Sequence, residues 1–198
     1  MKQLLVAIAL ATVAIFGVEK AFAGDYDTSQ HNFKIKFADF DFESRQTMNS
    51  DSDHVQLGYT MFNGKVNAQL RHTDRDDAET RARVTVSVLD MENFYLKQRI
   101  EWRHFQTADD YGRIRPIVGL KWNHVPSGIK LYTEYQASFN FDKEGEKNDF
   151  DLDSGQVKLG FDYRVNPALT MGPFIQWEHD NDYKKSDVFL GTNITFSF

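Results

Sequence analysis

The sequence contains no cysteine, only four prolines and, after its first 23 residues, no second apolar run of the signal or membrane-helix type. Without cysteine, no disulfide can hold an exported domain together, so packing and backbone pairing must do so. Basic residues are also in the minority, because 23 Lys and Arg stand against 29 Asp and Glu, a net charge of −6. Nucleic-acid binding needs a basic surface, so this balance argues against nucleic acid as a partner.

The N-terminus has the organisation of a secretory signal peptide. A lysine at position 2 precedes the apolar run 4–18, and the small-residue motif Ala21-Phe22-Ala23 follows it. An uncleaved membrane anchor is the alternative, but the run is shorter than the about 20 residues that a spanning helix needs. We therefore expect residues 1–23 to be removed and residues 24–198 to form one exported domain.

Beyond Gln30, apolar and polar side chains alternate in segments of about ten residues, separated by polar or turn-forming clusters. This period of two predicts β-strands. Within 31–43 the apolar residues stand at odd-numbered positions up to Phe37 and at even-numbered positions from Phe40. A β-bulge near Ala38 would cause this shift, and we expect one there. The ten predicted strands are 31–43, 54–61, 65–72, 81–88, 94–105, 112–122, 129–141, 156–165, 169–179 and 187–198.

Two prolines leave the strand count open between eight and twelve. Pro116 and Pro173 fall inside predicted strands, where each removes one hydrogen-bond donor from the ladder and could mark a bulge. Short turns such as Asn63-Gly64 alternate with longer polar loops such as the acidic 142–153. Outer-membrane barrels have this asymmetry, with short periplasmic turns and longer outer loops, so both chain ends are expected on the periplasmic side.

The predicted fold is all-β, a transmembrane antiparallel up-and-down β-barrel of the bacterial outer membrane. A soluble sandwich would also alternate, but the signal peptide, the loop asymmetry and an apolar last strand favour the barrel. In hydrocarbon every backbone group must be paired, so strands can span a bilayer only as a closed barrel. We expect outer-membrane lipid and lipopolysaccharide as partners, together with the barrel-insertion machinery, which would recognise the strand ending at Phe198.

The inward parity of the strands is basic. Lys and Arg exceed Asp and Glu there by about seven, and most remaining acids fall in loops. Rows of Arg and Lys favour anions in pores, and Arg can bind carboxylates through two parallel hydrogen bonds. The alternative is a plug, in which these cations pair with Glu101, Glu134, Asp162 and Glu178. The predicted pore-lining selectivity residues are Arg81, Arg83, Lys97, Arg99, Arg103, Arg113, Arg115, Lys121 and Lys130.

Three segments carry a resemblance to a known family: FYLKQRIEWRH at 94–104, RPIVGLKW at 115–122 and FLGTNITFSF at 189–198. Across most of the exported domain the chain resembles the oligogalacturonate-specific porins, small outer-membrane channels that admit acidic oligosaccharides. The resemblance implies a barrel with basic residues in facing ladders. It also implies twelve strands, from which the ten predicted strands depart.

We therefore predict a passive channel for small anionic solutes, with acidic oligosaccharides as the solute class. A closed structural or adhesive barrel is the alternative, and a barrel enzyme is a third. An enzyme would need a rim dyad such as His72 with Asp74, Asp76 or Asp77, or His179 with Asp180 or Asp182. Because no motif supports such chemistry and no histidines have metal-ligand spacing, we expect no enzymatic activity, no metal and no cofactor.

Overall fold

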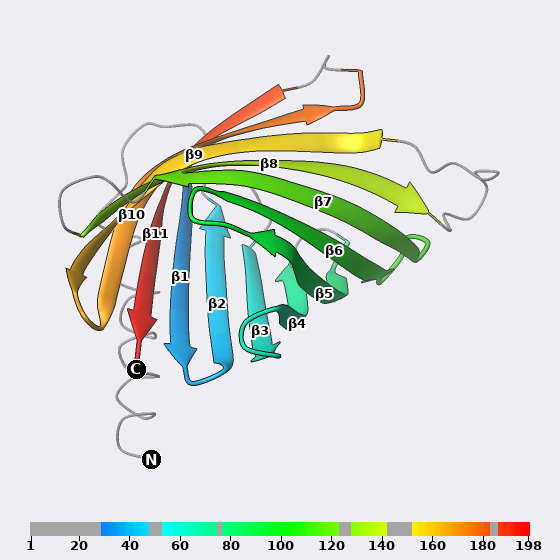
Figure 1. Cartoon of the computed structure of the whole chain (residues 1–198). Helices are drawn as coiled ribbons and strands as arrows, with labels where there is room; N and C mark the ends of the chain where they lie inside the picture. Colours follow the sequence, from blue (N-terminus) through cyan, green and yellow to red (C-terminus); the bar gives the residue numbers. More distant parts are fainter. Residues whose placement is uncertain (1–28, 48–52, 75–76, 123–127, 142–151, 183–185) are drawn as a thin grey trace.

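The computed structural model describes residues 29–47, 53–74, 77–122, 128–141, 152–182 and 186–198, and these form a closed barrel of eleven strands (Figure 1). Consecutive strands pair antiparallel, and β1 closes the barrel by pairing in parallel with β11. The prediction of an all-β, mostly antiparallel barrel is confirmed. In the described ranges, no helix is long and apolar enough to cross a membrane. The strands are β1 (Ser29–Phe37), β2 (Phe40–Thr47), β3 (Asp53–Met61), β4 (Val66–Asp74), β5 (Glu79–Asp90), β6 (Phe94–Phe105), β7 (Tyr111–Trp122), β8 (Ile129–Phe141), β9 (Leu152–Asn166), β10 (Leu169–Asp180) and β11 (Ser186–Ser197).

The eleventh strand arises because the predicted strand 31–43 is a hairpin. β1 and β2 are joined by a turn at Ala38 and Asp39, in which Ala38 has a φ of 50°. Phe37 then lies directly opposite Phe40. The prediction of a bulge near Ala38 was therefore wrong. A two-residue turn shifts the apolar positions by one residue just as a bulge does, so the sequence pattern does not distinguish the two.

An odd strand number places the two ends of the described chain at opposite ends of the barrel. Ser29 pairs with Leu190 near the start of β11, and Lys36 pairs with Ser197 near its end. The backbone N–H of Phe198 donates to the carbonyl oxygen of Lys36 at 3.0 Å. Ser29 and Phe198 are therefore a strand length apart, and the expectation that both chain ends share one side was wrong.

The connections define the two ends of the barrel. At the short-turn end, where the chain finishes, the strands are joined by 38–39, 62–65, 91–93, 123–128 and 167–168. At the long-loop end they are joined by 48–52, 75–78, 106–110, 142–151 and 181–185. The predicted turn at Asn63-Gly64 is confirmed, with φ values of 54° and 85°. The predicted signal peptide 1–23 and most of the acidic loop 142–153 lie outside the described residues.

The two prolines interrupt the ladders without ending the strands. β7 passes through Pro116, and its pairing with β8 resumes at Ile117. β10 passes through Pro173, and its pairing with β9 resumes at Phe174. The two ladders resume in the same register, so neither proline marks a bulge. Each proline lacks the N–H that the missing pair would need.

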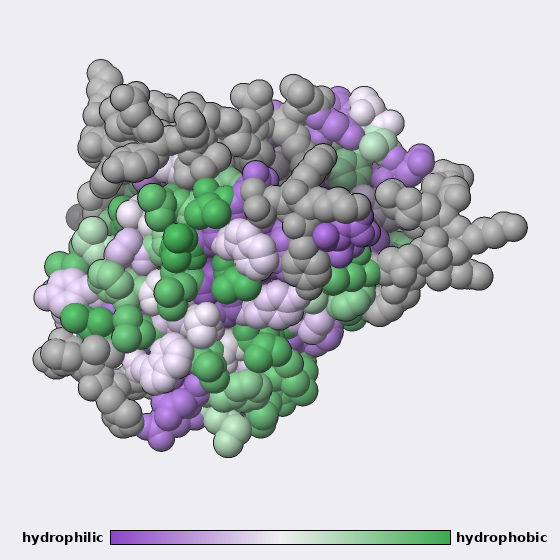
Figure 2. All heavy atoms as spheres, turned by 90° about the horizontal axis from the view of Figure 1, so that it is seen from above, coloured by the Kyte–Doolittle hydropathy of each residue, from purple (hydrophilic) through white to green (hydrophobic). Residues whose placement is uncertain are grey.

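The barrel has an apolar outside and a polar inside. Leu57, Leu70, Ile100 and Leu159 all point outward and are more than half exposed. Figure 2 shows apolar side chains gathered over much of the wall that grey atoms leave visible. By contrast, the most deeply buried side chains include Gln176, Glu79 and Glu101. This distribution is the reverse of that in a water-soluble protein.

Candidate functional site

The interior of the barrel, called the lumen below, holds two cavities. One of about 320 Å³ lies toward the long-loop end, and one of about 520 Å³ lies toward the short-turn end. The seven residues that line both cavities are named the belt. The belt consists of Arg45, Arg71, Arg83, Arg99, Glu134, Gln136 and Lys158.

Positive charge dominates the lining of both cavities. In the described part of the chain, twelve Lys and Arg line one or both of them, against five Asp and Glu. The two cavities differ in the kind of cation. Seven arginines and Lys158 line the long-loop cavity, whereas Lys34, Lys97, Lys121 and Lys130 line only the short-turn cavity. The lumen is therefore strongly basic although the chain as a whole is acidic.

Eight of the nine predicted pore-lining residues line these cavities. The exception is Arg103, whose guanidinium bonds with both oxygens of Glu79 and with the Tyr111 hydroxyl. Its inward orientation was expected, but this pairing holds it away from the cavities. The eight are Arg81, Arg83, Arg99, Arg113 and Arg115 with Lys97, Lys121 and Lys130.

Four further cations of the lumen were missing from the predicted set. Arg45 was missed because the apolar alternation stops at Phe42, so the first predicted strand ended at Glu43, whereas β2 continues to Thr47. Lys34, Arg71 and Lys158 were on the inward parity but outside the group of strands chosen. The basic surface therefore surrounds more of the lumen than one run of neighbouring strands.

Neutral side chains hold several of these arginines in place. The guanidinium of Arg71 donates to Gln56 Oε1 at 3.1 and 3.2 Å, and Arg83 donates to the same oxygen. Arg45 donates to Asn32 Oδ1 at 2.7 Å. An amide oxygen fixes the direction of a guanidinium but leaves its charge in place. Arg45 and Arg71 therefore keep their positive charge directed into the lumen, whereas Arg83 also lies 3.7 Å from the Glu101 carboxylate.

The acids that line the cavities have both charged and uncharged partners. Glu43 lies 3.6 Å from Lys34 Nζ, and Asp90 lies 2.6 Å from Lys121 Nζ. Glu134 accepts hydrogen bonds from Tyr95 and Gln136, each at 2.6 Å. Glu178 accepts from Gln156 at 3.1 Å and from Gln176 at 2.6 Å. Of the four acids expected in a salt-bridged plug, Glu101 alone forms ion pairs with arginine within the described ranges.

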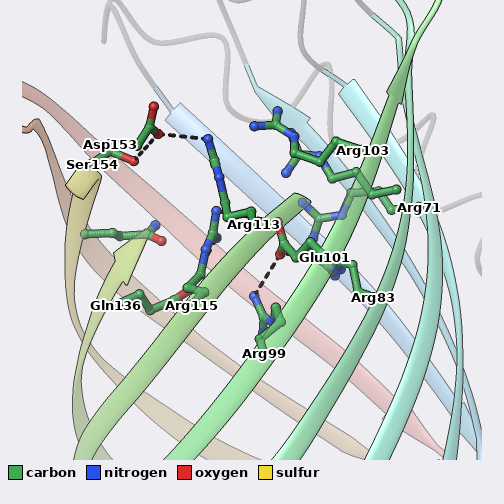
Figure 3. A network of polar contacts seen from close by, with 12 residues as sticks. Arg71, Arg83, Arg99, Glu101, Arg103, Arg113, Arg115, Gln136, Asp153 and Ser154 are labelled. Carbon is green, nitrogen blue, oxygen red and sulfur yellow. Dashed lines mark hydrogen bonds and ion pairs between the residues drawn. The ribbon is translucent and has the colours of Figure 1, made fainter. Parts of the chain in front are cut away.

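One wall of the long-loop cavity is cationic, and the facing wall carries amides and hydroxyls. Figure 3 shows the arginines of β4 to β7 converging on the interior, with Gln136 and Ser154 on other strands. Arg115 donates to Gln136 on the adjacent strand β8 at 3.5 Å, where the two walls meet. The second wall presents Gln30, Gln136, Ser138, Ser154, Gln156 and Gln176, together with Lys158 and the carboxylates of Glu134 and Glu178. A molecule with both carboxylates and hydroxyls would find partners on the two walls.

Aromatic rings in the lumen lie over glycines, which keeps them out of the cavity. In each case a ring on one strand covers an inward-facing glycine directly opposite on the next strand, where a Cβ would collide with it. The ring therefore lies against the barrel wall. The pairs are Tyr95 with Gly119, Tyr132 with Gly160 and Phe174 with Gly191.

Three histidines at the long-loop end have hydrogen-bond partners. His72 Nδ1 is 3.1 Å from the Thr80 hydroxyl, and His179 Nδ1 is 2.8 Å from the carbonyl oxygen of Asp180. An exposed pair that was not predicted joins His104 Nδ1 to Asp110 at 2.8 Å. This hydrogen bond holds the pKa of the Asp110 carboxyl below its usual range.

Neither the models of known protein families nor the curated proteins include a match to this chain.

Proposed function

We propose that this protein is an outer-membrane channel for the passive, non-enzymatic diffusion of small anionic solutes. The solute class we propose is acidic oligosaccharides. One observation carries the proposal: among the described residues, twelve cations and five acids line the two cavities of a chain whose net charge is −6. Cations along a water-filled path replace part of an anion's hydration and lower the cost of its entry.

The outer surface supports insertion in a bilayer. Large apolar side chains such as Leu57 and Leu159 are exposed all along the outward parity, and a closed barrel leaves no strand edge unpaired. Phe198 is half exposed at the end of the last strand. We propose outer-membrane lipid and lipopolysaccharide as the surroundings of this surface, and the barrel-insertion machinery as the partner that binds the last strand.

The choice of acidic sugars rests on the two walls of the long-loop cavity. Inorganic anions need only the cations, whereas the facing amides and hydroxyls add hydrogen-bonding groups that suit a hydroxylated solute. Arginine also matches a carboxylate better than a point charge does, because its planar fork makes two parallel hydrogen bonds.

Planar-bilayer recordings of the purified protein test the proposal. Under a KCl gradient, the reversal potential should show preference for chloride. Replacing the belt residues Arg71, Arg83 and Arg99 together by Gln should move the preference toward potassium. Arg164→Gln is the matched control, because Arg164 is exposed at the short-turn end and lines neither cavity.

Liposome swelling separates the solute classes. We expect faster entry of a galacturonate dimer than of a neutral disaccharide of similar size. Absence of channels, or a preference for potassium in the unaltered protein, would overturn the proposal in favour of a closed structural or adhesive barrel. Equal rates for the two sugars would leave an anion channel but reject acidic oligosaccharides.

A further inference from the structure

Glu101 lies at the centre of the arginine cluster. It points inward from β6, is fully buried, and has one arginine beside it from each of three neighbouring strands. Its carboxylate lies 3.7 Å from Arg83 and 3.8 Å from both Arg99 and Arg115. Figure 3 shows the carboxylate among these guanidinium groups.

These ion pairs are unusually loose. Charge-assisted hydrogen bonds between guanidinium and carboxylate are about 2.7–2.9 Å long, and all three distances exceed that range. Within the described ranges, neither oxygen of Glu101 accepts a hydrogen bond, and Nε of Arg83 and of Arg115 donates none. The three cations therefore have hydrogen-bonding capacity that Glu101 does not use.

Glu79, by contrast, is a conventional buried structural carboxylate. It accepts hydrogen bonds from Arg81 at 2.7 Å and from Arg103 at 2.8 Å. Its two arginines are thus fully engaged with it. The two buried glutamates lie on adjacent strands, but Glu79 forms direct hydrogen bonds with its arginines and Glu101 forms none. The loose arrangement at Glu101 is therefore a local feature.

Glu101 lies beside cations that line both cavities. Arg83 and Arg99 belong to the belt, and Arg115 lines the long-loop cavity. The belt itself carries four arginines and one lysine against Glu134. An anion that moves between the cavities must pass these cations, and it would compete with the Glu101 carboxylate for the same guanidinium groups.

We propose that Glu101 is an internal counter-ion that weakens the hold of the belt on passing anions. This inference rests on the proposed channel function. A channel conducts only when its sites bind ions strongly enough to admit them and weakly enough to release them. The Glu101 charge offsets part of the belt's positive field without occupying the path, because its side chain lies behind the guanidinium groups.

The test is Glu101→Gln, which removes the charge and keeps the shape. Citrate serves as the probe, and its block of the chloride current is measured in planar bilayers. We expect citrate to block the variant at about tenfold lower concentration, as the removal of one nearby unit charge predicts. The preference for chloride over potassium should rise, and the chloride conductance at high KCl should fall because release is slower.

Asp110→Asn is the matched control. It removes the same charge from an exposed loop carboxylate outside the lumen, so citrate block should stay within about twofold of the unaltered protein. The same Glu101→Gln change in an Arg115→Gln background provides a second comparison if the single variant does not fold. There too we expect tighter citrate block than in Arg115→Gln alone.

The outcomes separate this inference from the channel proposal. If the unaltered protein is anion-selective and Glu101→Gln leaves citrate block unchanged or weakens it, Glu101 is merely structural and the inference fails. If the unaltered protein forms no channel or prefers potassium, the channel proposal itself fails. Folding of each variant is checked by the different electrophoretic mobility of heated and unheated barrels.

Discussion

Buried carboxylates determine which arginines of this barrel are held tightly against the wall. Glu79 is fully buried and binds Arg81 and Arg103 directly, so it fixes two cations to the wall. Glu101 is equally buried but touches its three arginines only loosely. The sequence placed Glu101 on the inward parity of a predicted strand but left Glu79 before the start of the predicted strand 81–88, so it showed neither role.

Glu79→Gln should destabilise the barrel. The substitution leaves two closely held arginines without their carboxylate, and removal of one partner from a buried ion pair costs about 3 kcal/mol. We expect a lower urea midpoint, followed in detergent micelles by tryptophan fluorescence. Glu92→Gln in an exposed turn is the control and should change the free energy of unfolding by less than about 0.5 kcal/mol. Equal midpoints for both variants would show that the Glu79 pairs contribute nothing to stability.

Pairs of strands shape the short-turn cavity. The pairs β6–β7 and β8–β9 each place over a glycine a tyrosine that lines this cavity, Tyr95 and Tyr132. The pair β10–β11 places Phe174 over Gly191 in the same way, away from the cavity lining. A barrel of this size can be filled by its own side chains, so the glycines matter because they make room for rings at the wall. Alternation alone predicted that these residues face inward, but the cross-strand partner of each glycine depends on register.

Gly160→Ala should narrow the short-turn cavity. The new Cβ would lie 2.6 Å from the Tyr132 hydroxyl oxygen and 2.8 Å from Cζ, so the ring must move away from the wall. We expect a smaller single-channel conductance with an unchanged preference between chloride and potassium. Adding Tyr132→Ala should restore most of the conductance, although the Phe174 Cβ, 2.9 Å from the new atom, must still shift. If Gly160→Ala conducts normally, the glycine is not needed to seat the ring.

The closing pair of strands determines at which end of the barrel each end of the described chain lies. Because β1 and β11 run parallel, Ser29 lies at the long-loop end and Ser197 at the short-turn end. A barrel of ten strands would have brought both ends of the chain to one side. The difference comes from a single two-residue turn at Ala38 and Asp39.

The lack of native cysteine makes this placement directly testable. Ser29→Cys and Ser197→Cys each introduce a single thiol, which a bulky polyethylene-glycol maleimide labels without crossing the membrane. In intact cells we expect labelling of Ser29→Cys alone, and labelling of Ser197→Cys after the outer membrane is permeabilised. Equal labelling of both variants in intact cells would contradict the parallel closure.

The sequence by itself determined the strand type, the apolar outside, the basic inside and most of the lumen cations. A period of two assigns each residue to one face of the sheet, and this assignment depends only on neighbours in the chain. Arg83, Arg99 and Arg115 were placed on the inner face in this way, and all three line a cavity. The tertiary structure decided the odd strand count, because a turn and a bulge shift parity alike. It also decided which cations form the belt and which carboxylates hold them, since both depend on the register between strands far apart in the sequence.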